Sequence, residues 1–197
     1  MSKSFLFRIK LDIIEPEIWR EFFVPAEISL AKFHEVIQVV MGWEDAHLYE
    51  FEINKKRYEG DPDPDFSAGS LKASKYQLAD LMSAKTKTGR YVYDFGDNWR
   101  HTFKLINSNF VSPDGFPNGY GCLDGALACP PEDVGGPYFY ADYLEAISNP
   151  KHPDHQKAKK WSADVFDTTF DSSLFDIRQV NSYLAEIKPR KTRKKGI

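Results

Sequence analysis

Residues 91–101, with the sequence YVYDFGDNWRH, decide the fold that we expect for this chain. Their first five residues alternate between aromatic side chains and a valine or an aspartate, which is the period of a half-buried strand. Gly96-Asp97-Asn98 then has the composition of a turn. From Trp99 to Leu105, apolar or aromatic residues alternate with polar ones. The stretch therefore predicts a β-hairpin.

The length of the hairpin loop follows from the side chains that must share a face. A two-residue loop would place the tyrosines beside polar residues of the second strand, whereas a three-residue loop at 96–98 gives one apolar face. We therefore predict the three-residue loop, with a positive φ angle at its glycine or its asparagine. In this register Asp94 lies opposite Arg100 on the polar face. His101 lies near Tyr93 on the aromatic face.

The rest of the chain alternates between strand and helix patterns. Strands are expected at 5–13, 18–24 and 47–53, and helices at 30–40, 76–83, 137–149, 152–161 and 177–187. The segment 122–137 holds paired prolines and paired glycines and is expected to lack regular structure. These patterns predict an α+β fold, with a mostly antiparallel sheet built from hairpins, helices packed on it, and extra C-terminal helices. We expect one domain at 1–187 and a basic disordered tail at 188–197.

Composition and charge limit the classes of protein to which this chain could belong. A hydrophobic content of 42% in 197 residues fits a globular domain. The net charge is −3, but the run 188–195 (KPRKTRKK) holds six basic residues, which leaves 20 basic against 29 acidic residues elsewhere. An acidic body does not suit a dedicated DNA-binding surface, although the tail could contact nucleic acid through phosphates. Without a membrane-length apolar run or a signal-peptide pattern, we expect a cytoplasmic protein with no membrane contact.

The first functional hypothesis is a binding module. The aromatic hairpin, the tryptophan before the third strand and the acidic loop after the paired prolines would form a groove for a protein or peptide partner. No cofactor is required by this hypothesis. Its binding residues would be Trp43, His47, Tyr93, Asp94, Asp97, Trp99, His101, Glu132 and Asp133.

The second hypothesis is a divalent metal site serving a hydrolase or a nucleic-acid-processing enzyme. Its donors would come from His47, Asp94, Asp97, His101, Glu132 and Asp133, which are the nitrogen and oxygen ligands that such ions prefer. A structural zinc site formed by Cys122 and Cys129 with either histidine is a third arrangement, although six residues separate the cysteines. The simplest alternative is a core hairpin with a hydrogen-bonded histidine, a capped turn and two inert thiols.

Five stretches together resemble one protein family. They are IWREFFVP (18–25), GWEDAHLYEFEI (42–53), YVYDFGDNWRH (91–101), CLDGALACPPEDVGG (122–136) and FDTTFDSSLFDIRQVN (166–181). The chain is similar through them to the plasmid pRiA4b open-reading-frame-three-like family. The resemblance implies a single α+β domain of plasmid or mobile-element type without an assigned activity.

Some members of that family carry a recombinase or resolvase label. Such an enzyme needs a nucleophile supported by several arginines, because the transition state places charge on phosphate. The hairpin region of this sequence offers Arg90 and Arg100. We therefore expect no recombinase activity.

Overall fold

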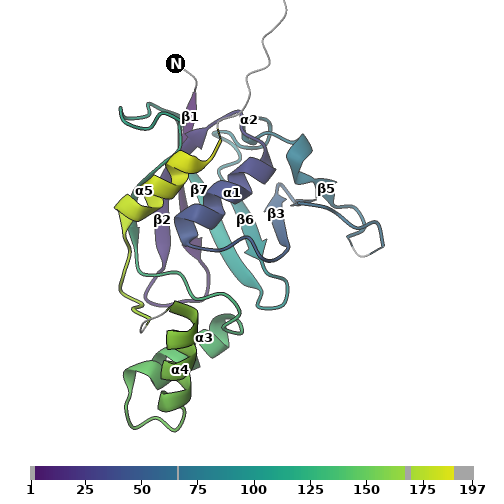
Figure 1. The fold of residues 1–197 in the computed structure, drawn as a ribbon. Helices are drawn as coiled ribbons and strands as arrows, with labels where there is room; N and C mark the ends of the chain where they lie inside the picture. Colours follow the sequence, from purple (N-terminus) through teal and green to yellow (C-terminus); the bar gives the residue numbers. More distant parts are fainter. Residues whose placement is uncertain (1–2, 66, 167–169, 189–197) are drawn as a thin grey trace, which may run out of the picture.

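The computed structural model describes residues 3–65, 67–166 and 170–188. Within them the chain folds around one sheet of eight strands, with the spatial order β5-β4-β3-β6-β7-β1-β2-β8 (Figure 1). Neighbouring strands run antiparallel, apart from β4 and β5, which are parallel. The predicted α+β class with a mostly antiparallel sheet is confirmed.

The elements have the following bounds. The strands are β1 (Ser4–Leu11), β2 (Trp19–Pro25), β3 (Tyr49–Ile53), β4 (Lys56–Glu59), β5 (Leu71–Lys72), β6 (Thr88–Tyr93), β7 (Trp99–Phe110) and β8 (Gly121–Ala126). The helices are α1 (Leu30–Met41), α2 (Leu78–Leu81), α3 (Gly136–Ser148), α4 (His155–Phe166) and α5 (Ile177–Glu186), with a 3-10 turn at Ala73–Lys75.

The central hairpin, β6 and β7, has the predicted faces but a different register. Tyr93 pairs with Trp99 and Tyr91 with His101, so the loop holds the five residues 94–98 and not three. The shift of two residues keeps the side chains that remain in the two strands on their predicted faces, because the side-chain period of a strand is two. It also means that the predicted pairs were wrong: Val92, and not Asp94, lies opposite Arg100.

The cause of the longer loop is the side chain of Asp94. The side-chain Oδ1 accepts a hydrogen bond from the backbone N–H of Gly96 (2.8 Å). The backbone carbonyl of Asp94 accepts a second one from the backbone N–H of Asn98 (2.6 Å). Aspartate competes in this way with strand pairing, because it offers the backbone a local partner. Asn98 has the predicted positive φ angle (58°). Phe95 is released from the apolar face and is 48% exposed.

Helix α1 covers one face of the sheet (Figure 1). The Ser29 side chain caps its first turn by accepting from the backbone N–H of Lys32, and Gly42 ends it with a φ angle of 104°. The ring of Phe33 lies at the centre of the core, and its aromatic neighbours are Phe7, Phe22, Phe51 and Phe103. The opposite sheet face carries exposed charged residues such as Lys10 and Lys104.

Strand β8 corrects the prediction that 122–137 lacks regular structure. Residues 121–126 form an edge strand beside β2. The side chain of Asn181, from α5, donates to the carbonyl of Cys122 (2.9 Å) and accepts from its backbone N–H (2.8 Å). Residues 121–126 show no strand pattern in the sequence, because they are mostly small and do not alternate between apolar and polar. The strand forms because these residues pair with distant segments of the chain.

The remaining predictions differ at helix boundaries and at the tail. Helix α2 begins after Gln77 and is shorter than the predicted 76–83, and α4 begins later than the predicted residue 152. The predicted tail at 188–197 lies outside the described residues, except for Lys188. Among the helices of the described ranges, none combines the length and the apolar character that crossing a membrane requires.

Gly89 allows the core to close, and its replacement tests the packing. It lies opposite Phe103, and a Cβ atom there would be 2.3 Å from Cζ of that ring. The ring is fully buried and cannot move aside. We expect Gly89→Ala to lower the free energy of unfolding by about 1–3 kcal/mol, measured by urea denaturation.

Two further variants separate overpacking from a general effect of alanine in this strand. Thr88→Ala changes the neighbouring exposed position and should leave the stability nearly unchanged. Phe103→Leu combined with Gly89→Ala should recover part of the loss relative to the sum of the two single changes. Equal stability of Gly89→Ala and the wild type would contradict the packing described.

Candidate functional site

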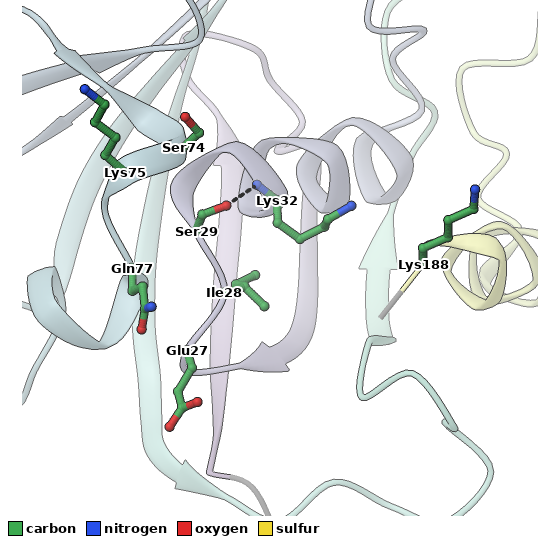
Figure 2. Close-up of a pocket in the computed structure, with 8 residues that line it drawn as sticks. All are labelled: Glu27, Ile28, Ser29, Lys32, Ser74, Lys75, Gln77 and Lys188. Atoms are coloured by element: carbon green, nitrogen blue, oxygen red, sulfur yellow. Dashed lines mark hydrogen bonds between the residues drawn. The ribbon is translucent and has the colours of Figure 1, made fainter. Parts of the chain in front are cut away.

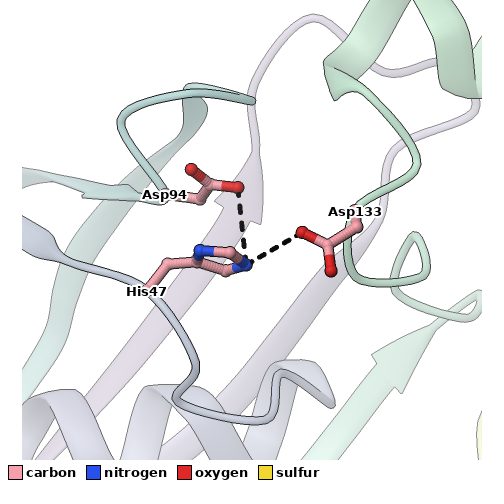
Figure 3. A group of neighbouring side chains, drawn as sticks. All are labelled: His47, Asp94 and Asp133. Carbon is pink, nitrogen blue, oxygen red and sulfur yellow. Dashed lines mark ion pairs between the residues drawn. The ribbon is translucent and has the colours of Figure 1, made fainter.

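Three loops meet at one end of the sheet. The first joins α1 to β3, the second joins β6 to β7, and the third joins β8 to α3. They bring together His47, Asp94 and Asp133, which are far apart in the sequence (Figure 3). One ligand atom from each of these residues lies within 4.8 Å of the other two. No other group of three histidine, cysteine or acidic residues with such spacing occurs in the described ranges.

The imidazole of His47 is the centre of this group. Its Nε2 lies 3.1 Å from Asp133 Oδ1, 3.7 Å from Glu132 Oε2 and 3.8 Å from Asp94 Oδ2. Nε2 is buried, yet it makes no hydrogen bond within the described structure. Three carboxylates therefore face one nitrogen atom without a formed hydrogen bond between them. We refer to His47, Asp94, Glu132 and Asp133 as the acidic cluster.

Glu132 is held in place through one of its two oxygens. Oε1 accepts hydrogen bonds from the hydroxyl of Tyr93 (2.9 Å) and the backbone N–H of Glu44 (2.8 Å). Oε2, which faces His47, is buried and has no hydrogen-bond partner in the described structure. Burial raises the pKa of the Glu132 carboxyl above its ordinary value. The cluster therefore holds a fixed carboxylate with one unsatisfied oxygen.

The loop that carries His47 is held by three consecutive backbone hydrogen bonds to side chains. The N–H of Glu44 donates to Glu132, that of Asp45 to Gln38 Oε1 (2.7 Å), and that of Ala46 to the Tyr93 hydroxyl (2.9 Å). A loop pinned at three successive positions has little freedom. The imidazole of His47 is thus positioned before any ligand arrives.

A second histidine supports the same loop from inside. His34 of α1 is buried, with Nδ1 2.7 Å from the Tyr91 hydroxyl and Nε2 2.7 Å from Asp45 Oδ1. Because Gln38 donates to that hydroxyl, the tyrosine proton goes to Nδ1, and Nε2–H donates to Asp45. Burial lowers the pKa of His34, which fits this neutral form. Its spacing along α1 did not reveal this role, because the partners come from other segments.

Asp97 lies outside the acidic cluster and has a structural role. Its Oδ2 accepts a hydrogen bond from the backbone N–H of Gly135 (3.0 Å), which ties the hairpin loop to the loop before α3. Gly136 approaches so closely that a Cβ atom there would be 2.6 Å from the Asp97 carbonyl oxygen. The structure therefore separates Asp97 from the other predicted ligands.

Four of the predicted aromatic binding residues lie in the core. Tyr93, Trp99 and His101 are fully buried, and Trp43 is nearly so. The Trp43 Nε1–H lies 3.4 Å from His101 Nε2, and the other ring nitrogen faces the Tyr91 carbonyl at 3.3 Å. Burial lowers the pKa of His101 to about 4, so its ring is neutral and both nitrogens face partners. These side chains do not line an open groove.

The cysteines do not join either histidine in a ligand group within the described residues. Both are free thiols, and Cys122 is buried with its Sγ near the carbonyls of Glu21 and Asp124. Burial raises the pKa of Cys122 to about 11 and that of Cys129 further above its ordinary value. Thiols of this kind are mostly protonated at neutral pH and are poor metal ligands.

The geometry of the acidic cluster suits one cation. Ligands about 2.1 Å from a shared ion are separated from each other by roughly 3.0–3.4 Å at octahedral or tetrahedral angles. The separations of 3.1–3.8 Å between His47 Nε2 and the three carboxylate oxygens are close to this range, and the ligand atoms of His47, Asp94 and Asp133 lie within 4.8 Å of one another. An imidazole nitrogen with carboxylate oxygens is a donor set for divalent ions such as Mn²⁺, Fe²⁺ or Zn²⁺.

A separate hollow of about 370 Å³ lies where α1 begins (Figure 2). Lys32, Lys75 and Lys188 contribute to its lining. The Ser29 hydroxyl, however, is engaged as the cap of α1, and the ammonium of Lys32 is paired with Glu35. Two of the polar groups that line this hollow are therefore already engaged by other residues.

The class of protein is an α+β domain, with a mostly antiparallel sheet of eight strands in the described residues and an acidic cluster at one end of that sheet. The sequence model of the plasmid pRiA4b ORF-3-like protein family matches residues 3–179, and the chain belongs to this family. The uncharacterized protein y4hQ of Sinorhizobium fredii is 35% identical over 188 residues, which is 95% of this chain and 93% of that protein.

A solved structure has the same fold. The crystal structure of MM3350, a protein of unknown function from Methanosarcina mazei Go1, superposes with a TM-score of 0.79 at 30% identity. The match covers 90% of this chain and 97% of that one. The plasmid description therefore comes from the family model, and the names of the two relatives assign them no activity.

The raised pKa of Glu132 gives a pH-dependent prediction. A carboxyl whose pKa is raised by folding contributes stability below its ordinary pKa of 4.5, and this contribution is lost as the pH rises through the folded value. In metal-free protein, Glu132→Gln should therefore be more stable than the wild type at pH 7–8. The difference should vanish below pH 4.5. Thermal unfolding followed by circular dichroism across this range measures both.

Glu44→Gln provides a matched control, since Glu44 is exposed and its contact with the cluster is made by the backbone. Because the Glu44 carboxylate adds only a minor repulsion to the raised pKa of Glu132, that variant should gain much less stability at pH 7–8 than Glu132→Gln does. A Glu132→Gln protein that is less stable than the wild type at pH 8 would contradict an unsatisfied, buried carboxylate at this position.

Proposed function

We propose that this protein binds a divalent metal ion through His47, Asp94 and Asp133, with Glu132 as a further carboxylate. One observation carries the proposal: a buried imidazole nitrogen that makes no hydrogen bond in the described structure faces three carboxylate oxygens at 3.1–3.8 Å. An ion between them would satisfy the nitrogen and neutralise carboxylates that otherwise repel one another. The pinned loops supply the rigidity that a metal site needs.

The donor set favours a first-row transition ion. One nitrogen and several oxygens suit Mn²⁺, Fe²⁺ or Zn²⁺ better than Cu⁺, which prefers sulfur, or Mg²⁺, which prefers oxygen and water. Asp133 is exposed, so solvent or a ligand could reach an ion beside it. An ion with an open position polarises a bound carbonyl or activates water. Any enzymatic use of this site would be of that hydrolytic kind.

The metal hypothesis takes precedence over the predicted aromatic groove for a physical reason. The groove needed Trp43, Trp99 and His101 at the surface, and these side chains are in the core. The acidic cluster, in contrast, gathers four of the six predicted ligands. A purely structural role, in which His47 only pairs with the carboxylates, is the alternative that the following experiment excludes or supports.

The test is metal binding by protein that has first been stripped with a chelator. We expect calorimetric titration with Mn²⁺ and Zn²⁺ to give one site per chain in the wild type. Asp94→Asn should lower the affinity by at least about 10-fold, because removing a ligand costs no less than removing a group that merely supports one. Asparagine keeps an oxygen for the Gly96 N–H, so the hairpin loop should survive.

Asp97→Asn is the matched control. It makes the same change three residues along the same loop, keeps an acceptor for Gly135, and lies outside the cluster. It should bind metal as the wild type does. Saturation at ~100 times the dissociation constant should also stabilise the wild type by about 2.7 kcal/mol, and not the Asp94→Asn protein. A wild-type protein that binds neither ion at millimolar concentration would refute the proposal.

A further inference from the structure

A hollow of about 390 Å³ lies between α3 and α4 and shares Asp133 with the acidic cluster. We propose that this hollow, the α3–α4 hollow, binds a peptide segment in which an aromatic side chain stands beside lysine or arginine. The inference goes beyond the metal site, and it does not require an ion to be bound. Its volume lies within the range of about 300–1,000 Å³ that is usual for ligand pockets.

The apolar wall of the hollow is rigid and accessible. Trp161 of α4 packs edge-on against Tyr143 of α3, with ring centroids 5.1 Å apart. Phe139 lies against Gly135, whose added Cβ atom would be 3.1 Å from the ring, and yet it is 65% exposed. The two helices are fixed to each other by His155 Nδ1, which lies 2.8 Å from the Ala146 carbonyl. Exposed aromatic rings on rigid helices are typical of recognition surfaces.

The charges around the hollow select a cationic ligand. Asp133, Asp142 and Asp154 contribute three carboxylates, against one ammonium from Lys157. Even with Asp133 engaged by a metal ion, the carboxylates outnumber the ammonium. A lysine or arginine side chain could pair with them and also lie over the Trp161 ring, which attracts cations. Phosphate-rich ligands such as nucleic acid would be repelled.

A histidine in the lining could hydrogen-bond to a peptide backbone, which a simple amine lacks. His152 lines the hollow, and its Nδ1 accepts a hydrogen bond from the backbone N–H of Asp154 (3.2 Å). A neutral ring that accepts at Nδ1 carries its proton on Nε2. It can then donate to a carbonyl oxygen of a bound peptide. An aromatic side chain, a positive charge and a carbonyl acceptor together describe a short basic peptide segment.

The experiment compares three probe peptides by calorimetry with the full chain. Acetyl-Lys-Phe-Lys-amide should bind at least ~10-fold more tightly than acetyl-Lys-Ser-Lys-amide or acetyl-Glu-Phe-Glu-amide, a difference of about 1.4 kcal/mol. Lys157→Glu should strengthen binding of the first peptide several-fold, and Asp142→Lys should weaken it. Phe139→Ser should abolish the advantage of the phenylalanine peptide.

Lys151→Glu is the control for charge, because it makes the same reversal at an exposed position outside the lining. It should change the affinity less than Lys157→Glu does. Asp94→Asn tests whether peptide binding is independent of the metal site. We expect this variant to bind the basic peptide as the wild type does, and this inference would then stand even if the metal proposal fails. Equal binding of the acidic and basic peptides, or no binding of the basic one at millimolar concentration, would overturn it.

Discussion

The hydroxyl of Tyr93 is the contact on which the functional end of the molecule depends. Its ring is fully buried in the core, while its oxygen accepts from the Ala46 N–H and donates to Glu132. One side chain therefore joins the packed sheet, the loop that carries His47 and the loop before α3. Tyrosine suits this position because it combines a large apolar body with a polar tip. The hairpin thereby fixes the positions of two loops that have no regular structure of their own.

The same arrangement concentrates negative charge. Glu132, Asp94 and Asp133 are drawn towards one imidazole, and burial opposes the charged form of Glu132. Such a cluster lowers the stability of the folded state, because neighbouring carboxylates repel one another. Sites that bind charged ligands commonly accept this cost. The pinned backbone of the His47 loop is consistent with a site prepared in advance.

The predictions from sequence succeeded where one face of an element is buried. Alternation gave the correct faces for the paired residues of the hairpin, and the helix predicted at 30–40 matches α1 almost to the residue. The predictions failed where the local structure depends on a side-chain hydrogen bond or on pairing with a segment that is distant in the sequence. Asp94 lengthened the loop through its bond to Gly96, and β8 exists because β2 and Asn181 pair with it. Neither effect leaves a periodic pattern.

The sequence by itself determined the α+β class, the aromatic core face and the residue types from which a site could be built. It could not sort the nine predicted binding residues, because sorting them requires knowing which loops meet. Only the tertiary structure put His47, Asp94, Glu132 and Asp133 together, while it placed His101 and Trp99 in the core and made Asp97 a loop tie. The reason is that strand alternation fixes the side of the sheet on which a residue lies. Contacts between loops depend on the register and order of all the strands.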